Sequence, residues 1–206
     1  MELVLYTANN SRGFLVEWLL EEIGEPYRRE LLDLSAGEHK QEPYLAIHPL
    51  GVVPALVVDG RPIIESLAIS LFLADAFPAA GLAPAVGGPE RGAYYQWMVY
   101  ATATVEPSLS AAFVRGLGCS PAERVSCATA EERSAFAAVL HPVEPGMTQG
   151  HLLESGGSAA DIVLATELYW ANQVGLLADC EAARHYLSAL MDRPSFRRAL
   201  SRSVPA

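Results

Sequence analysis

The sequence predicts an α/β domain with the element order βαβ-ββα and a mixed sheet, followed by an all-α domain. The short apolar runs that suit buried strands all lie before Ser66. A stretch rich in alanine, glycine and proline, 79–89, then has the composition of a linker. Beyond it the apolar residues recur with a helical period, and no convincing strand is found. We therefore divide the chain into domains at 1–78 and 90–206.

The first three elements form a βαβ unit. The apolar run Leu3–Tyr6 suits a buried strand, and a helical pattern with apolar residues on one face follows it. Gly24, with Pro26 just beyond, is typical of a helix end. The segment 27–34 indicates a second strand. Because a strand–helix–strand unit of this length joins neighbouring parallel strands, these two strands are predicted to be parallel.

A hairpin and a helix complete the first domain. After a polar loop with a short helix near 42–46, the segments 55–58 and 61–65 are separated by Asp59-Gly60. This dipeptide is favoured in two-residue hairpins, so these strands are predicted to be antiparallel. The mostly apolar stretch 66–78 then predicts a buried helix.

The second domain is predicted to be helical throughout. The segment 141–150 between two of its helices is expected to be irregular. The predicted helices are Arg91–Leu117, Pro121–Leu140, Ser158–Val174, Glu181–Met191 and a short last one after Pro194.

Composition narrows the functional class. The chain has 206 residues, 24 Asp and Glu against 14 Lys and Arg, and a net charge of −10. An acidic surface repels phosphate backbones, which argues against a nucleic-acid partner. We find no signal-peptide pattern and no apolar run long enough to span a membrane. The three cysteines form no metal-ligand pattern, so no metal is expected. These properties favour a soluble protein of the cytoplasm.

The dipeptide Val53-Pro54 stands where a strand should begin. With a cis peptide bond, the backbone N–H and C=O of Val53 could point away from the sheet, and an extended peptide ligand could pair with them. Taken alone, the residues fit better with an ordinary trans proline at a strand start.

Glu65-Ser66 stands where the next helix should begin. Free backbone N–H groups and the helix dipole favour an anion there, so a ligand carboxylate could bind Ser66 while Glu65 accepts from a ligand ammonium group. One α-amino acid end offers both groups. Taken alone, Ser66 is better explained as a helix cap.

Ser11 lies at the start of the first helix, after the first strand. A hydroxyl at this position can donate to an incoming thiolate, and a helix N-terminus lowers the pKa of a thiol. Asn9, Asn10 and Ser11 are also good helix caps, and Tyr6 offers another hydroxyl nearby.

Three motifs in this order resemble those of the glutathione transferase superfamily. They are HPLGVVPAL at His48–Leu56, ESLAI at Glu65–Ile69, and SAADIVLATELYWA at Ser158–Ala171. The resemblance covers nearly the whole chain and is to soluble, bacterial-like members of the serine- or cysteine-type classes. It implies a thioredoxin-like first domain, a homodimer, and glutathione as the cosubstrate. Ser158 and Asp161 match the family's buried capping box, whose role is structural.

The resemblance also implies how glutathione lies. The Val53 backbone, next to a cis Pro54, would pair with the cysteinyl part, and Glu65 and Ser66 would hold the γ-glutamyl end. Relatives often carry lysine or glutamine where this chain has Val52.

Further residues take roles through the same resemblance. Ser11 matches the position of the thiolate-activating residue, and Arg12 could add positive potential. His39 and Lys40 are expected near the glycyl carboxylate.

The resemblance places the acceptor substrate, a small electrophile, against the helical domain. Its candidate lining residues are Glu106, Phe113 and Trp170. The predicted reaction is attack by the glutathione thiolate on an electrophilic carbon, in detoxification. A glutathione-dependent isomerase or dehalogenase, or a non-catalytic binding or regulatory protein, would have the same first site. The electrophile is not identified, and Tyr6 or Asn10 remain alternatives to Ser11.

Overall fold

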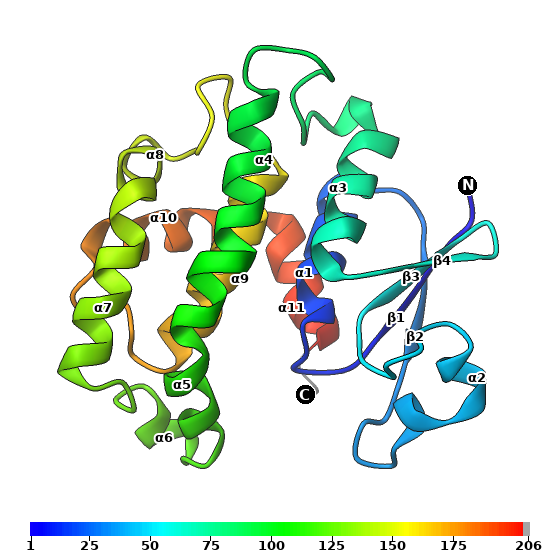
Figure 1. The fold of residues 1–206 in the computed structure, drawn as a ribbon, viewed down its shortest axis with the longest axis horizontal. Coiled ribbons are helices and arrows are strands. Elements are labelled where there is room, and N and C mark those ends of the chain that lie inside the picture. Colours follow the sequence, from blue (N-terminus) through cyan, green and yellow to red (C-terminus); the bar gives the residue numbers. More distant parts are fainter. Residues whose placement is uncertain (204–206) are drawn as a thin grey trace. The chain divides into compact units, whose positions relative to one another are not determined.

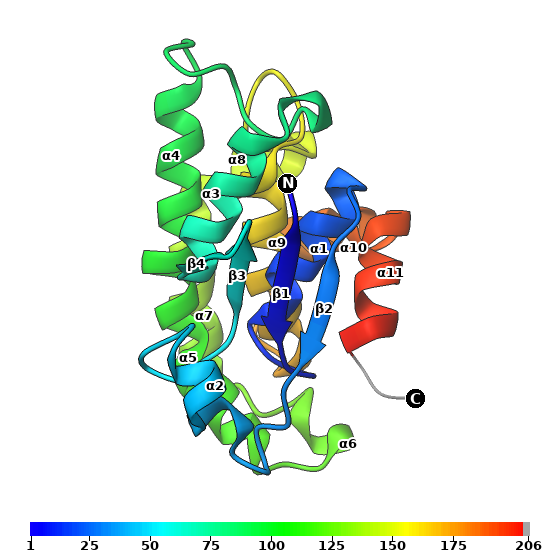
Figure 2. The ribbon, with the colours of Figure 1, turned by 90° about the vertical axis from the view of Figure 1, so that its right-hand side faces the viewer.

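The computed structural model describes residues 1–203, and the strands in this range form one four-stranded sheet (Figures 1 and 2). Its order is β2-β1-β3-β4. β1 and β2 are parallel, whereas β1 and β3, and β3 and β4, are antiparallel. The predicted βαβ unit, hairpin and mixed sheet are therefore confirmed. The strands are β1 (Leu3–Thr7), β2 (Arg28–Leu31), β3 (Ala55–Val58) and β4 (Arg61–Ile64).

Helix α1 (Gly13–Ile23) buries its apolar face against the sheet domain's core. It ends as predicted at Gly24, whose left-handed φ of 79° lets its N–H bond to the Leu20 carbonyl. Helix α3 (Ser66–Ala76) packs beside α1. The loop between β2 and β3 holds the 3₁₀ turn η1 (Glu38–Lys40) and the short helix α2 (Glu42–Leu45), and η2 (Pro78–Ala80) follows α3.

Contacts divide the chain into two units, Met1–Gly81 with the segment that begins at Arg193, and Leu82–Asp192. The sequence grouped everything after 90 with the second domain. In the structure the last helix, α11 (Pro194–Ser203), lies beside α1 (Figure 2). Phe196 of α11 is buried edge-on against Trp18, with ring centroids 4.9 Å apart, and burial of this aromatic pair explains the grouping.

Charged side chains reinforce the α1–α11 contact. Glu17 is fully buried and accepts from Arg29 Nε at 2.6 Å and from the Ser203 hydroxyl. Glu21 accepts from Arg198 Nε at 2.7 Å. A buried carboxylate is tolerated only when its oxygens are hydrogen-bonded, and these partners satisfy that condition.

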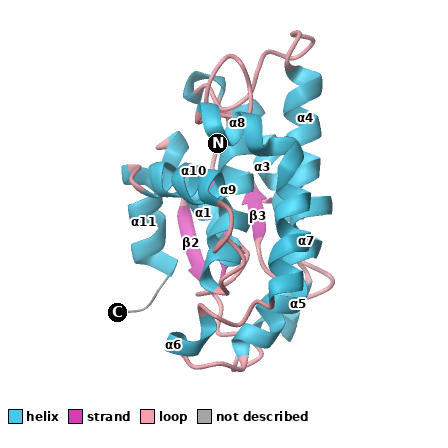
Figure 3. Ribbon diagram, turned by 90° about the vertical axis from the view of Figure 1, so that its left-hand side faces the viewer, coloured by secondary structure: helices cyan, strands magenta, loops and turns pink. Residues whose placement is uncertain are grey.

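The second unit is helical, and Figure 3 shows no strand arrow in it. Among its described residues, the only β-type pairing is an isolated bridge between Leu153 and Gly156. Helix α9 is buried along most of its length and contacts α4, α5 and α10. The unit contains α4 (Arg91–Tyr100), the π-helical segment η3 (Ala101–Val105), α5 (Glu106–Leu117), α6 (Pro121–Arg124), α7 (Ala130–Leu140), η4 (His141–Val143), α8 (Glu144–Gln149), α9 (Ala159–Gln173) and α10 (Glu181–Met191).

Two predictions in this unit are wrong. The expected helix Pro121–Leu140 is broken between α6 and α7, because Thr129 starts α7 with a capping box: its hydroxyl accepts from the Glu132 N–H at 3.2 Å. The segment 141–150, expected to be irregular, contains η4 and α8.

The capping box of Ser158 and Asp161 is confirmed. Asp161 accepts from the Ser158 N–H at 2.7 Å and its hydroxyl at 3.0 Å. No helix within residues 1–203 is both long and apolar enough to cross a membrane.

Candidate functional site

Several chain segments leave the sheet of the first unit at one edge. Tyr6, near the end of β1, pairs with Ala55, the first residue of β3. Ala55 in turn pairs with Ile64, the last residue of β4. The turn after β1, the residues before β3 and the residues after β4 therefore lie at the same edge. The predicted site residues in these segments are Ser11, Arg12, Val53, Pro54, Glu65 and Ser66.

The peptide bond between Val53 and Pro54 is cis, as the resemblance implied, and not trans, as the dipeptide taken alone favoured. Pro54 is buried and Val53 half-buried, immediately before β3. Proline at this position leaves the strand ladder intact, because the missing N–H falls outside the paired residues. A half-buried Val53 at the edge can present its backbone to a ligand strand.

Two residues that the sequence patterns did not single out shape this segment. The Tyr44 hydroxyl donates to the Val52 carbonyl at 2.5 Å, and burial raises the pKa of Tyr44 to about 12, so the phenol remains a donor. Gly51 has a φ of 55°, and a Cβ there would lie 2.4 Å from the His39 carbonyl oxygen. Glycine within the HPLG turn was a signal for Gly51, whereas nothing in the sequence marked Tyr44.

Replacing Tyr44 with phenylalanine is expected to lower the free energy of unfolding by about 1 kcal/mol, because one part-buried hydrogen bond is lost. Urea denaturation measures this change. Tyr95→Phe, on the exposed side of α4, is the matched control and should change stability by less than about 0.5 kcal/mol. Equal losses in the two variants would contradict the anchoring role.

Glu65 has an unusual backbone conformation. Its φ of 72° lies in a region that side chains other than glycine, asparagine and aspartate rarely adopt. Glu65 occupies the N-cap position of α3 but makes no capping hydrogen bond. Such strain costs about 1–3 kcal/mol and is concentrated at functional sites.

Ser66 is the first residue of α3 and is buried, with 8% of its surface exposed. The Ser66 carbonyl accepts a hydrogen bond from the Ser70 hydroxyl at 2.8 Å, and within residues 1–203 no side-chain hydrogen bond of the Ser66 hydroxyl is described. The simple capping role considered from the sequence is therefore not what the structure has. The Ser66 hydroxyl and the first N–H groups of α3 are hydrogen-bond donors at a helix N-terminus, the kind of position that favours an anion.

Ser11 lies half exposed in the turn before α1. Its hydroxyl donates to the Ala8 carbonyl at 2.6 Å and accepts from the Gly13 N–H at 3.2 Å. A hydroxyl rotates freely, so this proton can turn to a thiolate, and a charge-assisted bond is stronger than one to a carbonyl. The helix N-terminus adds positive potential at the same point.

The remaining predicted residues of the first unit lie around this edge. Arg12 is exposed at the start of α1. His39 and Lys40 belong to η1, and the Lys40 ammonium donates to the Leu50 carbonyl at 2.9 Å. The His39 Nδ1 atom is buried and has no hydrogen-bond partner within residues 1–203.

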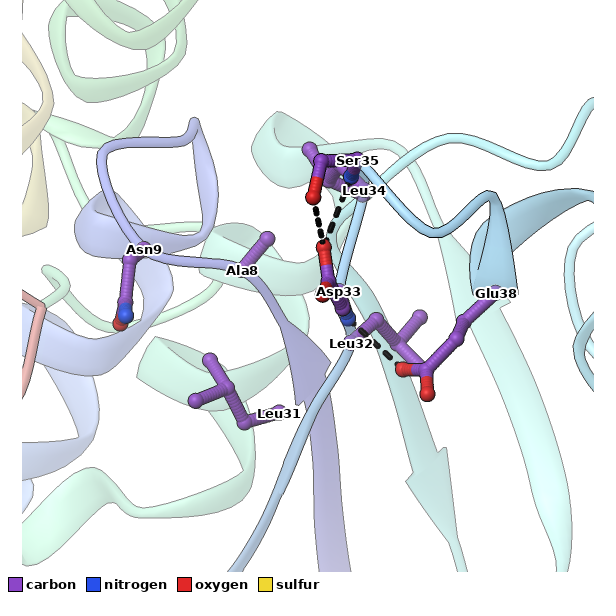
Figure 4. Close-up of a pocket in the computed structure, with 8 residues that line it drawn as sticks. All are labelled: Ala8, Asn9, Leu31, Leu32, Asp33, Leu34, Ser35 and Glu38. Atoms are coloured by element: carbon purple, nitrogen blue, oxygen red, sulfur yellow. Dashed lines mark hydrogen bonds between the residues drawn. The ribbon is translucent and has the colours of Figure 1, made fainter.

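A pocket of about 570 Å³ lies next to the ends of β1 and β2, on the side of β1 away from β3 (Figure 4). It is bounded by Ala8, Asn9 and the segment 31–38 after β2. The carboxylate of Asp33 accepts from the Ser35 hydroxyl and from the N–H groups of Ser35 and Ala36, which lowers the pKa of Asp33. This acidic lining disfavours a ligand with carboxylates, and in the sheet order β1 separates the pocket from β3 and β4.

The candidate acceptor residues belong to the second unit. Phe113 of α5 meets Trp170 of α9 edge-to-face, with ring centroids 5.6 Å apart. Both rings are half exposed. Glu106 is the first residue of α5, directly after the π-helical segment, and is half-buried. Within residues 1–203, no group of three or more metal-binding side chains could hold an ion.

Comparisons with known proteins place this geometry in a family. Residues 1–75 match the model of the glutathione S-transferase N-terminal domain. Glutathione S-transferase F10 of Arabidopsis thaliana is 30% identical over 198 residues, which cover 87% of this chain and 86% of that protein. The chain belongs to the glutathione S-transferase family.

Two further similarities add detail. A sphingomonad glutathione S-transferase, solved as a complex with glutathione, is 27% identical with a TM-score of 0.74, over 98% of this chain and 100% of that one. Maleylacetoacetate isomerase of Rhizobium meliloti is 40% identical over 85 residues, 41% of this chain and 40% of that enzyme. The structure thus has the thioredoxin-like first domain and helical second part that the resemblance implied.

Proposed function

We propose that glutathione lies along the sheet edge formed by Val53, Glu65 and Ser66, with its sulfur beside Ser11. The protein is a glutathione S-transferase, an enzyme with glutathione as its cosubstrate. The observation that carries the proposal is the strand register, which brings the Ser11 turn, the cis Val53–Pro54 bond and Glu65-Ser66 to one edge.

The backbone of Val53 is the proposed partner of the cysteinyl part of glutathione. An extended peptide can exchange N–H···O=C bonds with an exposed edge residue, as a short antiparallel strand does. This pairing uses backbone groups and no side chain. The valine side chain at position 52 therefore does not prevent it. Val52 is 47% exposed, so it leaves the adjacent surface open.

Glu65 and Ser66 are the proposed site for the γ-glutamyl end. The Glu65 carboxylate accepts from the ammonium group, while the Ser66 hydroxyl and the N–H groups of α3 donate to the carboxylate. His39 and Lys40 are the proposed polar and cationic groups for the glycyl carboxylate, and Arg12 is proposed to add positive potential next to Ser11. The strain at Glu65 is then retained because it aims the side chain at the ligand.

Ser11 is the proposed thiolate-stabilising residue. The glutathione thiol loses its proton to water, and the Ser11 hydroxyl then donates to the sulfur. The sulfur forms a bond to the electrophilic carbon. In a substitution, the leaving group departs with the electrons of the bond that breaks. In an addition, the π electrons at that carbon move to the neighbouring atom, which then takes a proton from water. Binding converts the encounter of the two reactants into a reaction within one complex.

The acceptor side is proposed to involve Glu106, Phe113 and Trp170 of the second unit. The two aromatic rings offer apolar surface, which suits an aryl or alkyl electrophile.

The proposal also includes a homodimer, a cytoplasmic location and a role in detoxification. The isomerase similarity spans only 40% of that enzyme, so isomerisation is not favoured.

Replacing Glu65 with glycine tests the proposed site. Glycine tolerates the φ of 72°, so stability should not fall, whereas glutathione affinity should fall at least about tenfold because a charge-assisted hydrogen bond is lost. Glu65→Gln should weaken binding to a similar extent. Isothermal titration with glutathione, and turnover of chlorodinitrobenzene, are the measurements.

The matched control is Glu25→Gln, in the exposed turn after α1, which should bind glutathione as the wild type does. Unchanged affinity in both Glu65 variants would contradict the placement of the γ-glutamyl end. Binding without any turnover by the wild type would instead support a non-catalytic protein.

A further inference from the structure

Two cysteines in the second unit lie unusually close together. Cys119 follows α5 and Cys127 precedes α7, and their sulfur atoms are 2.7 Å apart. A disulfide bond holds its sulfur atoms about 2.05 Å apart, so closure needs a shift of only about 0.7 Å. Both residues are free cysteines and half exposed.

Surrounding contacts hold the two cysteines in this arrangement (the segment with α6 in Figure 1). The Arg115 guanidinium donates to the Cys127 carbonyl at 3.0 and 3.3 Å. Arg124 Nε donates to the Gly116 carbonyl at 3.0 Å, which ties α6 back to the end of α5. The proximity of the sulfurs is thus supported by contacts on both sides of the pair.

We propose that Cys119 and Cys127 are a redox-sensitive dithiol that glutathione disulfide converts reversibly to an intramolecular disulfide. One cysteine thiolate attacks a sulfur of glutathione disulfide, whose S–S bond breaks and releases one glutathione thiolate. The second cysteine then attacks the mixed disulfide and releases the second glutathione. The protein loses two electrons and two protons, and glutathione disulfide becomes two molecules of glutathione.

The pKa of the Cys127 thiol affects the rate of thiol–disulfide exchange. The hydrogen bond to the Cys119 sulfur and partial burial raise the pKa of the Cys127 thiol. The thiolate is the attacking form, so the exchange should become faster as the pH rises above neutral. The closed bond would join the end of α5 to the start of α7 through a short loop, which limits opening of the α6 segment.

Peptide mass spectrometry tests the proposal on the wild-type protein. Reduced enzyme is equilibrated with glutathione disulfide, quenched in acid, alkylated and cut with trypsin. Cleavage at Arg115, Arg124 and Arg133 separates the cysteines into the peptides 116–124 and 125–133. We expect these peptides to be joined, two hydrogen atoms lighter than their sum, and to separate with dithiothreitol.

Three variants provide the controls. Cys119→Ser and Cys127→Ser should each keep a stable mixed disulfide with glutathione, because the second thiol is missing. Cys180→Ser should retain the link, since Cys180 lies elsewhere, beside α10, and burial raises the pKa of its thiol. Wild-type peptides that are both fully alkylated, or that both carry glutathione, would overturn the proposal.

Discussion

Replacing Ser11 with alanine is expected to lower kcat about 100-fold, while KM for glutathione changes less than about twofold. The hydroxyl is proposed to stabilise the thiolate, whose negative charge sits on the sulfur, whereas most of the peptide is bound elsewhere. Steady-state kinetics with chlorodinitrobenzene measures both constants. A loss in KM alone would show that Ser11 binds glutathione without activating it.

Ser11 also has a structural role, and the controls must separate a loss of stability from a loss of thiolate activation. Its bonds to Ala8 and Gly13 are worth about 1 kcal/mol, so Ser11→Ala should lower the melting temperature by a few degrees only. Ser201→Ala, an exposed serine on α11, is the matched control and should keep full activity. Full activity of Ser11→Ala would turn attention to Tyr6 and Asn10.

Replacing Asp161 with alanine is expected to lower the free energy of unfolding by about 4 kcal/mol, because a buried carboxylate with four hydrogen bonds is removed. The Ser158 N–H and hydroxyl donate to one oxygen, and the Leu152 N–H and the Tyr186 hydroxyl donate to the other at 2.8 and 2.6 Å. Burial and the nearby carboxylate raise the pKa of Tyr186, so it stays a donor that loses its acceptor. The melting temperature should fall by about 10 °C.

A surface aspartate is the control for this loss. Asp179, whose side chain is 67% exposed, accepts from Arg133 Nε at 2.8 Å. Asp179→Ala should cost less than about 1 kcal/mol, since exposed ion pairs contribute little. Similar losses in the Asp161 and Asp179 variants, measured by calorimetry, would show that the α9 cap is not a stability centre.

The sheet could be predicted because its signals are local. The Asp59-Gly60 dipeptide specifies a two-residue hairpin, and Gly24 marks the end of α1 within a few residues of the helix it stops. The same register brings the residues before β3 and after β4 to one edge, because Ala55 pairs with Ile64. The roles of Val53 and Glu65 at that edge came from the resemblance of the motifs and stay a prediction.

Features that depend on residues far apart in the sequence could not be predicted. The packing of Phe196 on Trp18 joins opposite ends of the chain, so the sequence grouped α11 with the wrong neighbours. The cysteines at 119 and 127 showed no recognised spacing, and only the fold of the α6 segment brings their sulfurs together. The Tyr44 bond to the Val52 carbonyl likewise has no sequence signature.

The central claim is that Ser11 stabilises the thiolate of glutathione bound at the sheet edge. Ultraviolet absorbance of the thiolate, followed against pH in the binary complex, gives the pKa of the bound thiol directly. We predict a pKa well below the usual value of about 8.5 for wild-type enzyme, and a return toward that value in Ser11→Ala. The Kd for glutathione should be unchanged at acidic pH, where the thiol is protonated in both complexes. The same lowered pKa in both proteins would contradict the account.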